Sequence, residues 1–373
     1  MRILQVDSGR EWRGGQNQVR LLCRELGRMP DIELLLVTKR GSELAHRARA
    51  EGVAVREVTW VIGTDPLAWT GLCGDLLRMR PHIVHAHDSH ALALALAARR
   101  WLRRLAAVLI APAAHEFGDA LGRVVATRRV DFHVRRRRGF VRALFGDSPW
   151  TKAEHVIAIS HAVKQVLVSD GLAAGEISVV PDGVDPDEVR RAGSTPLGIR
   201  ARLGVAAGTP LAVNVAALVD HKDHRTLLRA AHEARSLRPD LHWAIAGDGE
   251  LRGSLADQIT RRRLDGHVHL LGYVEAADAL IREADVFVMS SKEEGLGSVI
   301  LNALALGKPV VATAGGGIPE ILPPHALVPV GDAAALARKV VAALDHPSPL
   351  PLPPQFTASA MAQGVLAVYR SLL

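Results

Sequence analysis

The chain alternates between short apolar runs and longer segments whose apolar residues recur at helical spacing. In the first half, runs rich in Val, Ile and Leu lie at 2–6, 33–37, 82–87, 124–127, 156–160 and 177–180. Strands that are apolar on both faces and separated by helical patterns are typical of a parallel sheet covered by helices. The first half therefore predicts a Rossmann-like α/β domain.

The alternation begins again after a loop near residue 190 that is rich in Pro, Gly and Asp. The second series of apolar runs lies at 211–217, 242–249, 267–272, 285–291 and 309–313. Two similar series predict two Rossmann-like domains facing a central cleft, rather than one enlarged sheet. We expect domains at 1–190 and 191–355, then a C-terminal helix at 356–373 that packs back on the first domain.

Composition adds an expectation about partners and location. The 373 residues carry a formal net charge of +7, which favours an anionic partner: nucleic acid, a phosphorylated small molecule or a lipid surface. The two cysteines, Cys23 and Cys73, are too few for a disulfide framework and lack metal-binding spacing, so we expect a reducing compartment. No stretch reads as a signal peptide or a membrane span, which predicts a cytoplasmic protein, soluble or peripheral on the inner face of a membrane.

The loop 293–298, EEGLGS, directly follows an apolar run. In parallel α/β sheets, ligands bind beyond the carboxyl ends of strands, where helix N-termini offer free N–H groups. Gly295 and Gly297 would let the backbone approach a ligand closely. The carboxylate of Glu294 would repel a phosphate but suits the hydroxyls of a sugar. The loop predicts a ligand that carries both a phosphate and sugar hydroxyls. The alternative is that Glu293 and Glu294 only complement a helix dipole.

The motifs around this loop keep a recognisable order: EGLG at 294–297, ALGKPVVAT at 305–313 and GGIPEIL at 316–322. They resemble the signature of the retaining, nucleotide-sugar-dependent glycosyltransferases of family 4, which have the two-domain GT-B fold. The resemblance extends to GGQNQV at 14–19, VIAISHAVKQVL at 156–167, VVPDGVD at 179–185 and HKDHRTLLRAA at 221–231. Residues 92–150 match the family poorly.

The resemblance implies roles for five residues of the second domain. Glu294 contacts hydroxyls of the donor sugar. The backbone amides of Gly295, Leu296 and Gly297 approach the sugar or the diphosphate. Lys222 neutralises the diphosphate, and together with helix dipoles it would stabilise the leaving group.

Two positions depart from the family. Asn302 stands where a glutamate normally holds the ribose, so ribose binding is expected to be weaker or differently arranged. Ala217 replaces an arginine that the departing diphosphate would need, and His221, His224 and Arg225 are nearby candidates for the missing positive charge.

Backbone groups complete the donor site that the resemblance implies. Gly14 and Gly15 follow the first apolar run and would let the backbone of the first domain approach the diphosphate, although a lone Gly-Gly pair is also typical of a plain turn. Tyr273 and Val274 match the loop whose backbone reads the base.

Relatives also place a histidine after a strand of the first domain, close to the reacting centre. Two runs compete for that strand: one would put His115 at the position and the other, at 124–127, would put Arg129 there. We favour Arg129, because its run reads more cleanly as a strand followed by a loop. His85, His87 and Asp88 follow the preceding strand and are candidates for the acceptor side, although a structural role is the alternative for any single histidine.

The resemblance implies that a sugar moves, with retention, from a nucleoside diphosphate to a hydroxyl acceptor, which could be a glycan or a lipid-linked molecule. The leaving diphosphate would accept the acceptor's proton, so no carboxylate pair, metal or other cofactor is expected. An anionic membrane surface is a further candidate partner, and nucleic acid is not expected. The alternatives are a sugar-nucleotide epimerase of the same architecture and a degenerate, non-catalytic binder of anionic partners.

Overall fold

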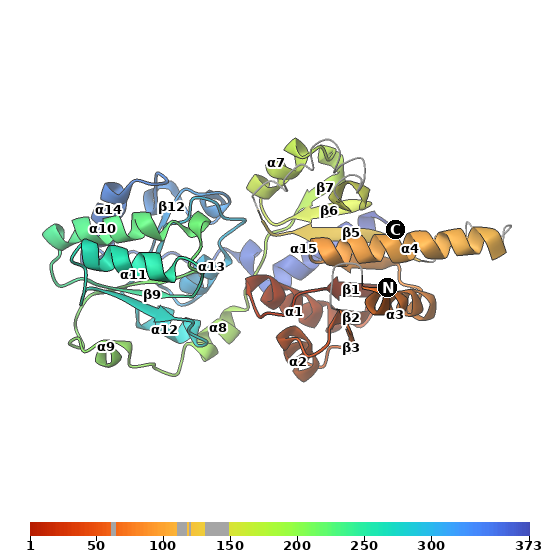
Figure 1. Cartoon of the computed structure of the whole chain (residues 1–373), viewed down its shortest axis with the longest axis horizontal. Helices are drawn as coiled ribbons and strands as arrows, with labels where there is room; N and C mark the ends of the chain where they lie inside the picture. The colour runs from red at the N-terminus through yellow and green to blue at the C-terminus, as the bar shows by residue number, and fades with distance from the viewer. Residues whose placement is uncertain (61–64, 110–117, 119–120, 131–148) are drawn as a thin grey trace. The chain divides into compact units, whose positions relative to one another are not determined.

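The computed structural model describes residues 1–60, 65–109, 118, 121–130 and 149–373. Their contacts divide the chain into two units, each built on a parallel sheet covered by helices (Figure 1). Unit 1 comprises Met1–Gly183 and Ala358–Leu373, and unit 2 comprises Val184–Thr357. The prediction of two Rossmann-like domains is confirmed.

The sheet of unit 1 has the strand order β3-β2-β1-β4-β5-β6-β7. The order reverses between β1 and β4, which creates a switch point at their carboxyl ends. Its strands are β1 (Arg2–Asp7), β2 (Glu33–Lys39), β3 (Val55–Val58), β4 (Ile83–Ala86), β5 (Arg123–Arg128), β6 (His155–Ala158) and β7 (Ile177–Val179). Its helices include α1 (Gly14–Gly27), α2 (Glu43–Ala50), α3 (Pro66–Met79), α4 (Ser89–Leu109), α7 (His161–Ser169) and α15 (Ala358–Ser371).

The sheet of unit 2 has the strand order β10-β9-β8-β11-β12-β13, with a second switch point between β8 and β11. Its strands are β8 (Leu211–Val215), β9 (His242–Ala246), β10 (Val268–Gly272), β11 (Val286–Met289), β12 (Val310–Thr313) and β13 (Leu327–Val328). Its helices include α8 (Pro186–Ala192), α9 (Ile199–Arg202), α10 (His224–Leu237), α11 (Arg252–Arg261), α12 (Ala277–Glu283), α13 (Ser298–Ala305) and α14 (Ala333–Asp345).

The central strands are buried on both faces, which explains their continuous apolar sequences. Every residue of β11 and of β4 is buried. In unit 1, the core also includes the C-terminal helix α15, where Met361 and Tyr369 pack in one cluster with Ile3 and Leu21. The terminal helix therefore completes the core of unit 1, as the sequence predicted.

The boundary between the units differs from the predicted one. Unit 2 begins at Val184, before the expected break at residue 190. The reason is that α8 packs against α12 and α13 of unit 2. The chain returns to unit 1 at Ala358, after Thr357 has paired with Val184 in an isolated parallel bridge.

Two strands were missed by the apolar pattern. The edge strand β3 reads VREV, and its charged residues are only half buried, so it lacks a continuous apolar run. The strand β13 has only two residues, Leu327 and Val328, and pairs with β12 alone. Short strands at the edge of a sheet carry too little burial to leave a clear sequence pattern.

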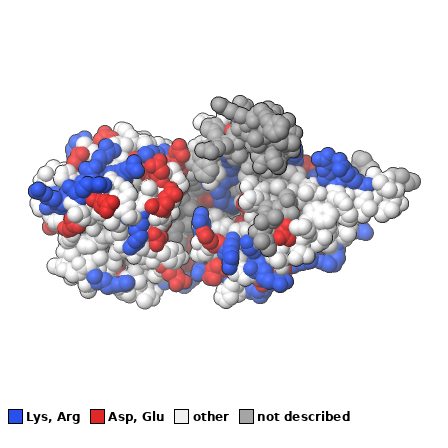
Figure 2. Space-filling model, viewed as in Figure 1, with Lys and Arg blue, Asp and Glu red and all other residues white. Residues whose placement is uncertain are grey.

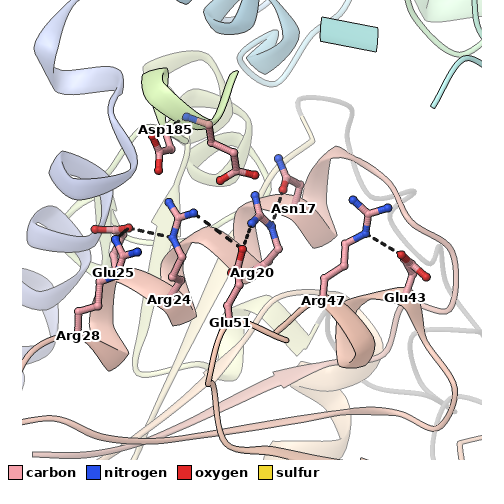
Figure 3. A network of polar contacts seen from close by, with 10 residues as sticks. Asn17, Arg20, Arg24, Glu25, Arg28, Glu43, Arg47, Glu51 and Asp185 are labelled. Atoms are coloured by element: carbon pink, nitrogen blue, oxygen red, sulfur yellow. Dashed lines mark hydrogen bonds and ion pairs between the residues drawn. The ribbon is translucent and has the colours of Figure 1, made fainter. Parts of the chain in front are cut away.

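Ion pairs hold α1 against α2 in unit 1. Figure 3 shows Arg20 and Arg24 of α1 directed at the carboxylate of Glu51, which caps the C-terminus of α2. Both arginine side chains are nearly buried, at 7% and 8% exposure, so the pairs are poorly screened by solvent. Arg47 of α2 also lies over the ring of Trp12, 4.5 Å from its centroid. These contacts position α1, whose first residue is Gly14.

Candidate active site

The first group of predicted site residues lies at the switch point of unit 2. The neighbouring strands β8 and β11 end there, and the loop after each carries one of the charged candidates. Lys222 follows β8 in a short 3₁₀ turn, and Glu294 follows β11 directly before α13. Parallel pairing brings both loops to one edge of the sheet.

Lys222 and Glu294 form an ion pair with each other, from Lys222 Nζ to Glu294 Oε2. The hydroxyl of Ser291 donates to the same carboxylate oxygen at 3.1 Å. The hydroxyl of Ser290 donates to the backbone oxygen of Lys222 at 2.9 Å, which ties the two loops together. The side chains are 16% and 14% exposed, so the pair is shielded but open to a ligand.

The glycines that follow β12 allow close backbone packing on the Glu294 loop. A Cβ at Gly317 would overlap the carbonyl oxygen of Gly295, and one at Gly315 would overlap that of Ser291. The amide of Gly317 donates to the carbonyl of Glu294 at 2.8 Å. Gly317 belongs to the motif GGIPEIL, but the sequence indicated no role for it; in the structure Gly315 and Gly317 support the loop that carries Glu294.

Gly297 ends this loop in the left-handed region, with φ of 86°, and caps the N-terminus of α13. A residue with a side chain would be strained in this conformation. Gly295 and Leu296 precede it in the same turn, and Leu296 is buried at 1% exposure. Leu296 therefore anchors the turn by packing, and the whole residue, backbone included, is buried in this structure.

Asn302 lies on α13, and its amide donates to Asp278 Oδ1 of α12 at 2.7 Å. Burial raises the pKa of Asp278, and the hydrogen bond from Asn302 opposes that rise. Asp278 belongs to no motif and was not among the predicted site residues. Tyr273 and Val274 follow β10, with Tyr273 exposed at 67%.

The candidates for the missing positive charge near Ala217 do not contribute equally. His224 is buried at 1% exposure, and burial together with Lys222 lowers its pKa to about 4. It is therefore neutral at pH 7 and cannot replace the arginine. Arg225 is exposed and lines a surface groove with Ser254 and Gln258 of α11.

A second group of polar residues lies at the switch point of unit 1. Asp7 ends β1, and Asp88 follows β4 and caps α4 by accepting the amides of His90 and Ala91, each at 2.9 Å. Ser8 donates both its amide and its hydroxyl to Asp88, each at 2.7 Å. Asp7 is 1% exposed, and burial and the charge of Asp88 raise its pKa to about 6.

Arg129 follows β5, which confirms a strand over the favoured run 124–127. Its Nε donates to Asp182 Oδ1 at 3.2 Å, and its NH1 donates to His87 Nδ1 at 3.4 Å. A Cβ placed on Gly15 would lie 3.8 Å from Arg129 Cδ, so Arg129 stands beside the start of α1 at Gly14. His115 lies outside the described residues.

The two histidines of β4 and its following turn are structural. His85 is fully buried between Tyr369 and Thr127, and burial and Arg129 lower its pKa to about 3. His87 bonds Gln5 at 2.6 Å, and burial, His85 and Arg129 lower its pKa well below its ordinary value. Both ring nitrogens of His85 are hydrogen-bonded within unit 1, so neither is available to a sugar acceptor. The sequence did not indicate that Gln5 and Tyr369 contact these histidines, because the two residues lie 364 positions apart.

Among solved structures, the fold resembles that of HepE from Anabaena in complex with UDP. The TM-score is 0.72 at 18% identity, with 100% of this chain and 98% of that chain covered, a similarity that concerns the fold alone. The family model "Glycosyltransferase Family 4" matches residues 12–188, and the model "Glycosyl transferases group 1" matches residues 198–360. The chain belongs to the family 4-like GT-B glycosyltransferases.

The chain also matches curated relatives over parts of its length. It is 28% identical over 206 residues to the 2-deoxystreptamine glucosyltransferase of Streptomyces kanamyceticus, covering 53% of each chain. It is 32% identical over 182 residues to a "GDP-mannose-dependent monoacylated alpha-(1-6)-phosphatidylinositol monomannoside mannosyltransferase" of Corynebacterium glutamicum, covering 45% of this chain and 47% of the relative. The chain thus spans about half the length of these curated relatives.

Proposed function

We propose that this glycosyltransferase moves a sugar, with retention of anomeric configuration, from a nucleoside diphosphate to a hydroxyl acceptor. The observation that carries the proposal is the Lys222–Glu294 ion pair at the switch point of unit 2. A diphosphate and a sugar together match what this pair offers, namely one cation and one carboxylate on adjacent loops.

Donor binding would exchange the partners of the ion pair. The diphosphate would take Lys222 Nζ, and Glu294 would be released to accept hydrogen bonds from the sugar hydroxyls. The N-terminus of α13, behind Gly297, adds backbone N–H groups that favour a negative charge. As the sugar leaves, the same cation and helix end would stabilise the charge that develops on the diphosphate.

Retention follows from the way the acceptor's proton is removed. In our proposal a diphosphate oxygen takes that proton on the face from which the diphosphate departs, so the acceptor attacks from the same face. Glu294 does not serve as the base in this scheme, because its carboxylate, once released by Lys222, accepts hydrogen bonds from the hydroxyls of the donor sugar. No metal or other cofactor takes part in this scheme.

Two similar proteins support a nucleotide-sugar donor but differ in base: the HepE structure is a complex with UDP, and the Corynebacterium relative is named GDP-mannose-dependent. The acceptor is equally open, because the Streptomyces relative is named for 2-deoxystreptamine and the Corynebacterium relative for a phosphatidylinositol mannoside. We propose a glycan or lipid-linked acceptor on the basis of the name of the Corynebacterium relative and of an exposed apolar face on α4.

The last turns of α4 carry an apolar face bordered by arginines. Trp101, Leu105, Val108 and Leu109 are exposed at 42%, 38%, 79% and 69%. Arg100 and Arg104 lie exposed beside them. This end of α4 projects beyond the sheet of unit 1 (Figure 1), and Figure 2 shows blue arginines next to white residues there. Apolar insertion combined with positive charge is typical of interfacial helices on anionic lipid, which would bring unit 1 to a lipid-linked acceptor.

Within the described part of the chain, no helix combines the length and the apolarity needed to cross a bilayer. Membrane association would therefore rest on contacts such as those of α4. We propose a peripheral position on the cytoplasmic face of a membrane, where nucleotide sugars are supplied.

The proposal is tested by a calorimetric binding screen of UDP, GDP, ADP and their sugars, followed by NMR of the product. We expect one base to be preferred and the product to keep the anomeric configuration of the donor. An inverted product would contradict retention. Conversion of the donor to a stereoisomer without any acceptor would favour the epimerase alternative, and strong salt-dependent binding of nucleic acid with no nucleotide affinity would favour a non-catalytic binder.

A further inference from the structure

Asp278 and Asn302 form a hydrogen-bonded pair close to the carboxyl edge of the sheet of unit 2. The amide Nδ2 of Asn302 donates to Asp278 Oδ1 at 2.7 Å. Asp278 is the second residue of α12, which begins after the loop that follows β10. Asn302 lies on α13, one turn after its first residue Ser298, or about 6 Å along the helix axis. The pair therefore lies within about one turn of the N-termini of both helices.

The pair presents two further oxygen atoms that no other side chain or backbone group uses. An ionised carboxylate only accepts hydrogen bonds, so Asn302 turns its NH₂ toward Asp278 and its Oδ1 away. In the described part of the chain, neither Asn302 Oδ1 nor Asp278 Oδ2 has a hydrogen-bond partner, and neither atom is completely enclosed. Both residues are half-buried. Two acceptor oxygens with one negative charge are thus held close together and can be reached by a ligand.

The chemistry of the pair matches hydroxyl groups rather than phosphate, because a carboxylate repels a phosphate but accepts hydrogen bonds from hydroxyls. A nucleoside diphosphate sugar carries hydroxyls in two places, on the transferred sugar and on the ribose, with the diphosphate between them. In the proposed function, Glu294 receives the transferred sugar, and Lys222 with the N-terminus of α13 receives the diphosphate. A second hydroxyl-binding pair beside the same end of α13 fits the ribose, the remaining part of the donor that carries hydroxyls.

We propose that Asp278 is a specificity-determining residue for the donor: together with Asn302 it binds the two hydroxyls of the ribose, and it thereby selects ribonucleotides over 2′-deoxyribonucleotides. This inference rests on the proposed function. It also gives a reason for the asparagine at position 302. A glutamate there would bring a second negative charge beside the carboxylate of Asp278, and the two charges would repel each other.

The first test compares UDP with 2′-deoxy-UDP, and GDP with 2′-deoxy-GDP, by calorimetry with the wild-type protein. Removal of one hydroxyl leaves one oxygen of the pair without its donor. We therefore expect the preferred base to bind about tenfold more tightly as its ribonucleotide. Equal affinities of the ribonucleotide and its deoxy form would overturn the inference and leave the proposed function in place. Absence of binding by all four compounds would overturn the proposed function, and the inference with it.

The second test is Asp278→Asn, which keeps the size of the side chain but removes its charge. The free carboxylate oxygen is replaced by an NH₂ group, which cannot accept a hydrogen bond from a hydroxyl. We expect the preference for the ribonucleotide to fall from about tenfold to below about threefold, mainly through weaker binding of the ribonucleotide. A preference that stays at about tenfold in this variant would overturn the inference.

Matched variants separate ribose binding from helix packing. Leu280→Val, at a fully buried position of α12, should lower the melting temperature but retain the preference of about tenfold. Asn302→Ala removes the other half of the pair and should reduce the preference as Asp278→Asn does. A reduced preference in Leu280→Val, or an unchanged one in Asn302→Ala, would show that the contact between Asp278 and Asn302 serves only to pack α12 on α13.

Discussion

The buried carboxyl of Asp7 should make unit 1 less stable as the pH rises. Its pKa is raised from 3.8 to about 6, first by burial and then by the charge of Asp88. A raised folded-state pKa means that the stabilising contribution is fully present below pH 3.8 and is lost as the pH passes through 6. Asp7→Asn removes this titration, and an asparagine oxygen can still accept the amide of Gly9, which Asp7 Oδ1 accepts at 2.9 Å.

The magnitude follows from the pKa. Near pH 5 the higher pKa of Asp7 in the folded state stabilises the folded wild type by about one pKa unit. Near pH 8 Asp7 is ionised in both the folded and the unfolded state, so this contribution is absent. One unit corresponds to about 1.4 kcal/mol. The free energy of unfolding of Asp7→Asn minus that of the wild type should therefore be about 1.4 kcal/mol more favourable at pH 8 than at pH 5.

Urea unfolding followed by tryptophan fluorescence measures this difference. Trp243 is the only one of the six tryptophans in unit 2, so the signal reports mainly on unit 1. Both proteins are unfolded at pH 5 and pH 8 at equal ionic strength. A difference that is the same at both pH values, or that favours the variant more at pH 5, would refute the reasoning about Asp7.

Two further predictions concern the glycine run and α4. Gly317→Ala should push the carbonyl of Gly295, and with it the Glu294 loop, away from residue 317, costing about 1–3 kcal/mol of unfolding free energy and weakening nucleotide-sugar binding. The control is Gly253→Ala in α11, where no atom lies within 4 Å of the new Cβ, and this variant should not be destabilised. Equal losses of unfolding free energy in both variants would contradict the role of Gly317 in supporting the Glu294 loop. Replacing Trp101 and Val108 by Ser should reduce sedimentation with anionic vesicles, whereas Leu237→Ser, at an exposed site on unit 2, should not. Unchanged sedimentation of the α4 variant would show that the apolar face of α4 does not bind the membrane.

The sequence predicted those parts of the fold that depend on burial along a single element. A continuous apolar run such as β11 can only be satisfied in the centre of a sheet, so its place was recognisable. The edge strand β3 has charged residues and weak burial, and its pattern was not distinctive. The domain boundary was misplaced because α8 looks like part of a linker until α12 and α13 provide a surface for it.

The candidate site shows the same division. The position of Glu294 and Lys222 at one sheet edge follows from where their strands end, which the sequence contains. Their contact with each other does not, since it depends on how two loops fold. Gln5 and Tyr369 meet only because α15 returns to the first unit, and Asp278 reaches Asn302 only through the packing of α12 on α13. Contacts between residues that are far apart in sequence leave no local pattern from which they could be predicted.

The central claim is that the loop of Glu294 binds the sugar of an activated donor while Lys222 binds its diphosphate. The most direct test compares wild type and Glu294→Ala in titrations with a nucleoside diphosphate and with its sugar derivative. We predict that the variant binds the nucleotide sugar about 10–100-fold more weakly, the value of one charge-assisted hydrogen bond. Its affinity for the free nucleoside diphosphate should be unchanged or higher, because Lys222 no longer has a partner to leave. Equal affinity of both proteins for the nucleotide sugar, or no nucleotide binding by the wild type, would contradict the account.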